Sequence, residues 1–116
     1  MNDLSMTDYQ MAAAETTIYK GAGDATTEAI NYTILGLAGE AGELCNSFKK
    51  ALRDDNGIVT AERADNLAKE LGDVLWYVAN AANELGYPLE LIAKQNLQKL
   101  KSRAARGVIS GSGDNR

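Results

Sequence analysis

The sequence predicts an all-α protein, and three observations lead to this prediction. Only one proline occurs in 116 residues, so little interrupts helical structure. Apolar residues recur at alternating spacings of three and four along two long segments, which is the period of a helix face that packs against a core. Residues typical of helix ends separate these segments.

The first helix is expected from about Thr7 to Tyr19, with Thr7 as its N-cap, and Gly21 and Gly23 end it. The second helix is expected from Asp24 or Thr26 to about residue 53, before a turn of composition Asp-Asp-Asn-Gly. Its predicted core face comprises Ile34, Leu37, Ala41, Leu44, Phe48 and Ala51.

The third helix is expected from a Thr60 cap to Leu85, with Gly86 at the position after its end. Its predicted core residues are Leu67, Leu71, Val74, Val78 and Leu85. Pro88 suits the first position of a fourth helix that fades after Ala105. That helix is expected to direct Leu89, Ile92, Leu97 and Leu100 towards the core.

The domain is expected to span residues 1–106, and the glycine-rich residues 107–116 form a flexible tail. The second and third helices would each be about 40 Å long. Helices of this length project from a small monomer, so we expect a four-helix bundle that is completed by dimerisation, as a homodimer or a homotetramer.

Composition excludes several classes of protein. A net charge of −4 argues against non-specific nucleic-acid binding. The N-terminus lacks the pattern of a signal peptide, and no apolar run is long enough to cross a membrane. The single cysteine, Cys45, forbids an intrachain disulfide, so we expect a cytoplasmic protein. With no histidine, any metal must be held by oxygen ligands, which favours magnesium, manganese or calcium.

Two acidic pairs are the main candidates for chemistry: Glu40 with Glu43, and Glu70 with Asp73. The i, i+3 spacing places both acids of a pair on one helix face. Four carboxylates brought together at a core edge would repel one another unless protons or divalent cations neutralised them. The alternative is that each pair lies on an ordinary solvated helix face.

Glycines inside the helices support a site at these acids. Gly36, Gly39 and Gly42 lie in the second helix and Gly72 in the third, where each costs about 1 kcal/mol relative to alanine. Close helix approach or room for a ligand would offset that cost.

The segments LGLAGEAGELCNSFKKAL, KELGDVLWYVANAANELG and NLQKLKSR, in this order, resemble the MazG-type all-α nucleotide pyrophosphohydrolases. The resemblance covers about residues 33–103 and is closest to short members from phages and mobile elements. It implies a helical bundle, a magnesium site formed by Glu40, Glu43, Glu70 and Asp73, and cleavage of nucleoside triphosphates to monophosphate and pyrophosphate. We expect manganese to be able to substitute for magnesium. The chain departs from many relatives at residues 53–59, where they have a histidine-containing segment, so contacts of that loop with base or sugar are in doubt.

The resemblance also implies substrate contacts, at Lys50, Asn80, Asn96, Lys99 and Arg103. Asn96, Lys99 and Arg103 form one line along the fourth helix and suit the phosphate oxygens. Without the family match, a solvated face near a helix C-terminus is the simpler interpretation of the two cations.

In the expected mechanism, Mg²⁺ held by the acids activates water for in-line attack on the α phosphorus, with Glu43 as general base. Trp76 and Tyr77 suit base stacking, although core or dimer packing is more common for such residues. The tail is expected to close over the bound nucleotide, with Arg116 gripping phosphate or base. The alternatives are a non-catalytic helical dimerisation module and hydrolysis of another phosphate ester.

Overall fold

The computed structural model describes residues 3–116, and four helices account for most of this stretch. They are α1 (Met6–Glu15), α2 (Thr27–Asp54), α3 (Ala61–Leu85) and α4 (Leu89–Ala105). The described residues contain no strand, so the predicted all-α class is confirmed. None of these helices combines the length and the apolar character that a membrane crossing requires.

The predicted ends of α1 are wrong at both sides. Ser5, and not Thr7, caps the helix by accepting a hydrogen bond from the Asp8 amide at 3.0 Å. The helix stops at Glu15, before the predicted Tyr19. The hydroxyls of Thr16 and Thr17 donate to the last helical carbonyls at 2.9 and 2.8 Å, and these bonds compete with continued helix.

The ends of α2 and α3 follow their capping residues as predicted. The side chains of Thr26 and Thr60 accept amide hydrogen bonds in the first turns, and Gly86 ends α3 in the left-handed conformation, at φ 76°. Pro88 is the N-cap of α4 and not its first helical residue. Its extended backbone turns the chain away from α3.

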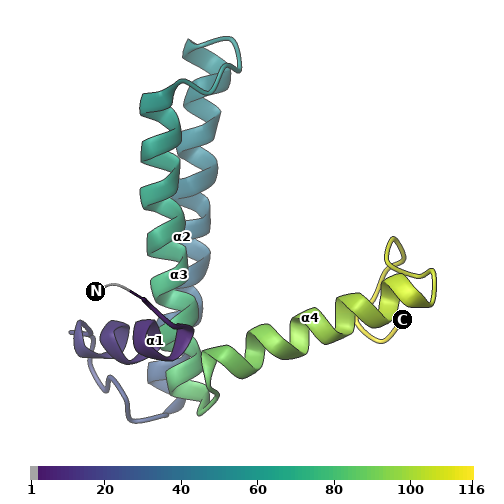
Figure 1. Cartoon of the computed structure of the whole chain (residues 1–116). Helices are drawn as coiled ribbons and strands as arrows, with labels where there is room; N and C mark the ends of the chain where they lie inside the picture. Colours follow the sequence, from purple (N-terminus) through teal and green to yellow (C-terminus); the bar gives the residue numbers. More distant parts are fainter. Residues whose placement is uncertain (1–2) are drawn as a thin grey trace.

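The helices α2 and α3 form a long antiparallel hairpin, and α1 crosses it near the base (Figure 1). From this base α4 extends away from the hairpin, contacting α1 and α3 but not α2. The radius of gyration is therefore 16.9 Å, compared with about 13 Å for a compact domain of this length. The four helices do not lie side by side within one chain, and completion of the bundle by another chain stays a prediction.

The core is small and lies where the base of the hairpin meets α1 and the start of α4. Ala13, Ala79 and Leu89 form its buried centre, with Tyr9, Trp76 and Val78 packed around it. Beyond this junction, several predicted core residues are exposed in the single chain. These residues are Ile34, Phe48, Leu71, Leu85, Ile92, Leu97 and Leu100. Their helix faces have no partner because α4 does not fold back along the hairpin.

Buried polar side chains hold this junction together. The Glu84 carboxylate is 2% exposed and accepts hydrogen bonds from the Tyr19 hydroxyl and from the amides of Gly23 and Ala25. It ties the connection between α1 and α2 to α3. Gln10 donates to the Tyr87 carbonyl at 2.9 Å and accepts from the Leu89 amide at 2.7 Å, so it sets where α4 begins.

Candidate functional site

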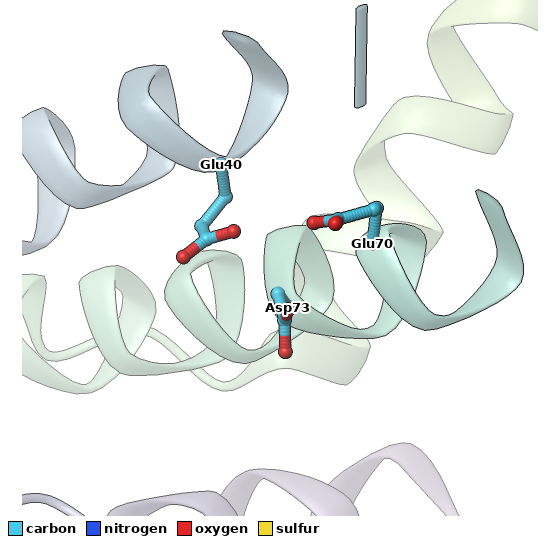
Figure 2. A group of neighbouring side chains, drawn as sticks. All are labelled: Glu40, Glu70 and Asp73. Atoms are coloured by element: carbon cyan, nitrogen blue, oxygen red, sulfur yellow. The ribbon is translucent and has the colours of Figure 1, made fainter. Parts of the chain in front are cut away.

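Three of the four predicted metal ligands lie together where α2 and α3 pack side by side. One carboxylate oxygen from each of Glu40, Glu70 and Asp73 lies within 4.8 Å of the other two. Glu40 comes from α2, and the other two come from successive turns of α3 (Figure 2). Glu40 and Glu70 are half-buried, whereas Asp73 is exposed. The pairing of the hairpin thus joins acids from both predicted pairs into one cluster, which we call the carboxylate cluster.

Glu43 is not part of this cluster. Its side chain is exposed one turn further along α2 from Glu40. Its charge still acts on the cluster, because it contributes to raising the pKa of Glu40. Its predicted roles as ligand and general base are not tested by this arrangement.

The electrostatics of the cluster are those of uncompensated negative charge. Burial raises the pKa of Glu40 above its ordinary value, and the charges of Asp73 and Glu70 raise it further. No lysine or arginine within residues 3–116 forms an ion pair with the three carboxylates. A set of oxygen donors without nitrogen, sulfur or a counter-cation fits a hard divalent cation such as Mg²⁺ or Mn²⁺.

A cavity of 370 Å³ opens beside the cluster. Glu40 and Asp73 line one side of it, and Thr16, Trp76 and Tyr77 line the rest. The Trp76 indole donates a hydrogen bond to the Thr16 hydroxyl at 2.7 Å, so α3 and the end of α1 share this wall. A larger cavity of 580 Å³ near Tyr19 and Tyr32 contains one carboxylate and no cluster. The smaller cavity is therefore the better candidate for a phosphate ester bound at a metal.

Gly36 makes room for the Tyr77 ring next to Glu40. A Cβ at Gly36 would lie 2.1 Å from Cε1 of Tyr77, so any side chain would displace the ring. Close approach of the two helices at a glycine is thus confirmed at this position. A Cβ at Gly39, Gly42 or Gly72 would meet nothing within 4 Å. These three glycines leave open space in the single chain.

Asn80 is buried where α3 packs on α1. It is 1% exposed, and its amide donates to the carbonyl of Trp76 at 3.2 Å and, at 3.4 Å, to that of Ala13. In this structure Asn80 joins α3 to α1. Lys50 lies apart from the cluster. It is exposed near the end of α2, about 15 Å along the helix from Glu40, where its charge acts on Asp54.

The remaining predicted substrate contacts lie on α4 and the tail. Asn96 is exposed, while Lys99 and Arg103 contact the tail residue Asp114. Because α4 points away from the hairpin, one chain does not bring these residues to the carboxylate cluster (Figure 1).

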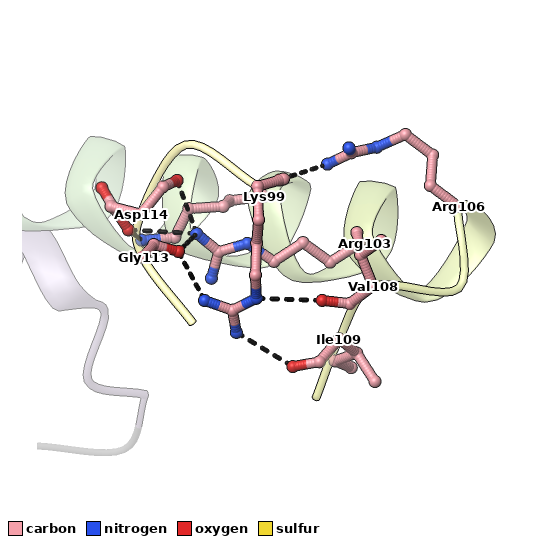
Figure 3. Close-up of polar contacts among 8 residues, drawn as sticks. Lys99, Arg103, Arg106, Val108, Ile109, Gly113 and Asp114 are labelled. Carbon is pink, nitrogen blue, oxygen red and sulfur yellow. Dashed lines mark hydrogen bonds and ion pairs between the residues drawn. The ribbon is translucent and has the colours of Figure 1, made fainter. Parts of the chain in front are cut away.

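The tail does not cover the carboxylate cluster in this structure but folds back on the last turns of α4 (Figure 3). The Arg116 guanidinium donates to the carbonyls of Val108 and Ile109, each at 2.9 Å, and to that of Gly113. Arg116 therefore binds the tail's own backbone. Closure of the tail over a nucleotide stays a prediction.

Sequence reasoning did not find Thr16 or Tyr9 near the site. The position of Tyr9 is seen in its pKa, which burial raises and the charge of Asp73 raises further. Both residues belong to α1 or its end, and their place beside the cluster depends on how α1 crosses the hairpin. No local spacing signals such a contact.

The comparisons with known proteins give the family of this chain. A sequence model of the MazG nucleotide pyrophosphohydrolase domain matches residues 28–108, which include all four acids. The chain is also 55% identical over 109 residues to the Gene 37 protein of Mycobacterium phage L5, covering 93% of this chain and 96% of that protein. No solved structure matches the chain significantly. From the domain match, which spans most of its length, the chain belongs to the MazG nucleotide pyrophosphohydrolase family.

Proposed function

We propose that the protein is a magnesium-dependent pyrophosphohydrolase that converts nucleoside or deoxynucleoside triphosphates in the cytoplasm to monophosphate and pyrophosphate. One observation carries the proposal. The carboxylates of Glu40, Glu70 and Asp73 converge beside a cavity of 370 Å³, in a chain of the MazG family. Burial and the charges of Asp73 and Glu70 raise the pKa of Glu40, and a divalent cation would offset this repulsion.

The residues present fit the metal that the family implies. Glu40, Glu70 and Asp73 would hold Mg²⁺, or Mn²⁺ as a substitute, and Glu43, whose charge acts on Glu40, is the proposed fourth ligand. When bound, the ion supplies positive charge that offsets the charge of the phosphate oxygens and makes water easier to deprotonate.

The chain's own residues would then serve the reaction as follows. Glu43 accepts a proton from water as the water oxygen attacks the α phosphorus. The bond from the α phosphorus to the bridging oxygen breaks, and pyrophosphate leaves with that oxygen. Trp76 and Tyr77 line the cavity, where their rings would limit the access of other water and offer a face to a base or sugar.

We further propose that α4 of a second chain supplies the cationic contacts. Lys99 and Arg103 lie on α4, the arm that leaves the hairpin, so in one chain they are remote from the carboxylate cluster. The hairpin and the arm both expose apolar residues that a homodimer or homotetramer would cover, among them Leu71, Leu75, Leu97 and Leu100. Assembly would bring an anion-binding arm and a metal-binding hairpin to one substrate.

A substrate panel tests the proposal. Canonical and modified nucleoside and deoxynucleoside triphosphates would be incubated with the full chain and Mg²⁺, and the products separated. We expect pyrophosphate and the monophosphate in equal amounts from at least one member. Release of orthophosphate, or no turnover of any member, contradicts the proposal.

The exposed apolar faces also favour the alternative of a non-catalytic dimerisation module. The two are separated by thermal melting at constant ionic strength. A metal centre gains stability from Mg²⁺ that rises with the logarithm of the ion concentration once this exceeds the Kd. A solvated acidic face responds only to ionic strength.

A further inference from the structure

The tail forms a closed loop on the C-terminal end of α4. After Gly107, at φ 73°, the chain turns back, and the three hydrogen-bonding groups of Arg116 hold carbonyls of the loop together (Figure 3). A Cβ at Gly111 would lie 2.7 Å from Cδ of Arg116, so this glycine lets the guanidinium pass. This loop places the side chain of Asp114 over the cations of α4.

Asp114 contacts both cations that the sequence analysis assigned to phosphate. Its Oδ1 accepts from Lys99 Nζ at 2.6 Å and from Arg103 Nη2 at 3.1 Å. Arg103 Nη2 also donates to the Asp114 carbonyl at 2.6 Å. One carboxylate oxygen is thus shared by two cations that lie one turn apart on α4.

The two sides of this contact are built differently. The Arg103 side chain is 6% exposed and lies on α4, whereas the Asp114 side chain is 77% exposed and lies in the tail. Arg103 Nε is also buried and donates to no acceptor within the described residues. A buried donor without a partner is costly. Because Asp114 contacts Nη2 and leaves Nε without an acceptor, it satisfies the guanidinium only in part.

A phosphate group is the ligand that such a pair of cations fits better. The planar guanidinium offers several donors in a fork, and phosphate has more acceptor oxygens and more charge than one carboxylate. An exposed ion pair such as Lys99 with Asp114 contributes little to stability and is easily exchanged.

We propose that Lys99 and Arg103 form a phosphate-binding site that Asp114 occupies when no ligand is bound, so that the tail competes with the phosphate groups of the substrate. Binding displaces the carboxylate and frees the tail from α4. The identity of the phosphate ligand as a nucleotide rests on the proposed function, but the competition does not.

The test measures pyrophosphate binding to the full chain by calorimetry, in EDTA and without divalent ions, so that the carboxylate cluster does not contribute. Asp114→Asn removes the competing charge. Glu90→Gln is the matched control, because it removes one negative charge from the same arm, where Glu90 pairs with Lys94 at 3.4 Å. We expect Asp114→Asn to bind pyrophosphate about fivefold tighter than wild type, a factor typical of the loss of one exposed ion pair.

Glu90→Gln should change the affinity for pyrophosphate by less than about twofold. Its surface charge lies in the first turn of α4, away from Lys99 and Arg103, and is largely screened there. Adding Lys99→Gln to Asp114→Asn should abolish the gain. Equal or weaker binding by Asp114→Asn, a gain as large in Glu90→Gln, a gain that survives Lys99→Gln, or no measurable binding by any variant overturns the inference.

Failure of this inference is distinguishable from failure of the proposed function. If the protein hydrolyses a triphosphate but Asp114→Asn binds pyrophosphate as wild type does, the proposed competition is wrong and the proposed function stands. If no triphosphate is hydrolysed but Asp114→Asn shows the expected gain in affinity for pyrophosphate, the proposed function is wrong and the proposed phosphate site stands.

Discussion

The substitution Glu40→Gln separates a metal centre from an ordinary structural carboxylate, because it has opposite consequences with and without ions. It replaces a half-buried carboxylate by an amide of nearly the same shape. In a metal centre, the ion-free protein should become more stable, while stabilisation by Mg²⁺ and catalysis should both be lost. A carboxylate that serves folding would show neither effect.

The magnitude follows from the geometry of the cluster. Two unit charges 4.8 Å apart repel by about 0.9 kcal/mol in bulk water. Glu40 faces two such charges, those of Glu70 and Asp73, and screening by salt lowers the sum to about 1 kcal/mol. For a domain of this size, 1 kcal/mol corresponds to an increase in Tm of roughly 4 °C.

The assay is thermal melting followed by circular dichroism, in EDTA and in Mg²⁺ at matched ionic strength, with pyrophosphate release measured on the same samples. Loss of a ligand should lower turnover by about 100-fold or more, since even the outer partners of a metal site contribute up to that much. Glu28→Gln is the control. This substitution also removes one negative charge from α2, but in the exposed first turn of the helix. The Glu28→Gln protein should keep the stabilisation by Mg²⁺.

Two results would refute the reasoning. In EDTA, a Glu40→Gln protein that melts below wild type would mean that this carboxylate stabilises the fold. An increase in Tm with Mg²⁺ equal to that of wild type would mean that the ion binds elsewhere.

The remaining predictions concern packing, pH and assembly. Gly36→Ala should destabilise the protein by about 1–3 kcal/mol in chemical denaturation, because the added methyl overlaps the Tyr77 ring. Gly39→Ala is the control and should not destabilise it, because a methyl there meets open space. Equal effects of the two substitutions would exclude the overlap as the cause. Glu84→Gln should cost about 1.5–3 kcal/mol, the value of hydrogen bonds to a buried charged group. Burial alone raises the pKa of Glu84, but hydrogen bonds from Tyr19, Gly23 and Ala25 more than offset this and lower it below 4.5. The contribution of the Glu84 carboxylate to stability is therefore present above pH 4.5 and lost as the pH falls through its lowered pKa. The stability of Glu84→Gln should lack this acid-dependent part. Parallel profiles of stability against pH in wild type and variant would contradict this prediction. Sedimentation should show a dimer or tetramer at micromolar concentration, and a monomer throughout that range would remove the proposed second-chain arm.

The helices can be predicted from the sequence wherever their ends depend on neighbouring residues. The Thr26 and Thr60 caps and the left-handed Gly86 are local features, and the helix bounds follow them. The acid pairs and the family also follow from the sequence, because i, i+3 spacing and the order of short motifs need no knowledge of distant contacts. The end of α1 was missed because a competing hydroxyl bond at Thr16 is not distinguished by periodicity.

Which acids meet and which residues are exposed depends instead on how the helices pack. Spacing along a helix places Glu40 and Glu43 on one face, but the rotation and depth of the α2–α3 pairing bring Glu40, and not Glu43, to Glu70 and Asp73. The same periodicity marks Leu71 and Leu97 as core, yet they are exposed because the direction of α4 depends on Gln10 and Leu89 at the junction. Asn80 became a link to α1, and Arg103 became a partner of Asp114. Each outcome depends on contacts between segments far apart in the chain, whose geometry is set by packing and not by local spacing.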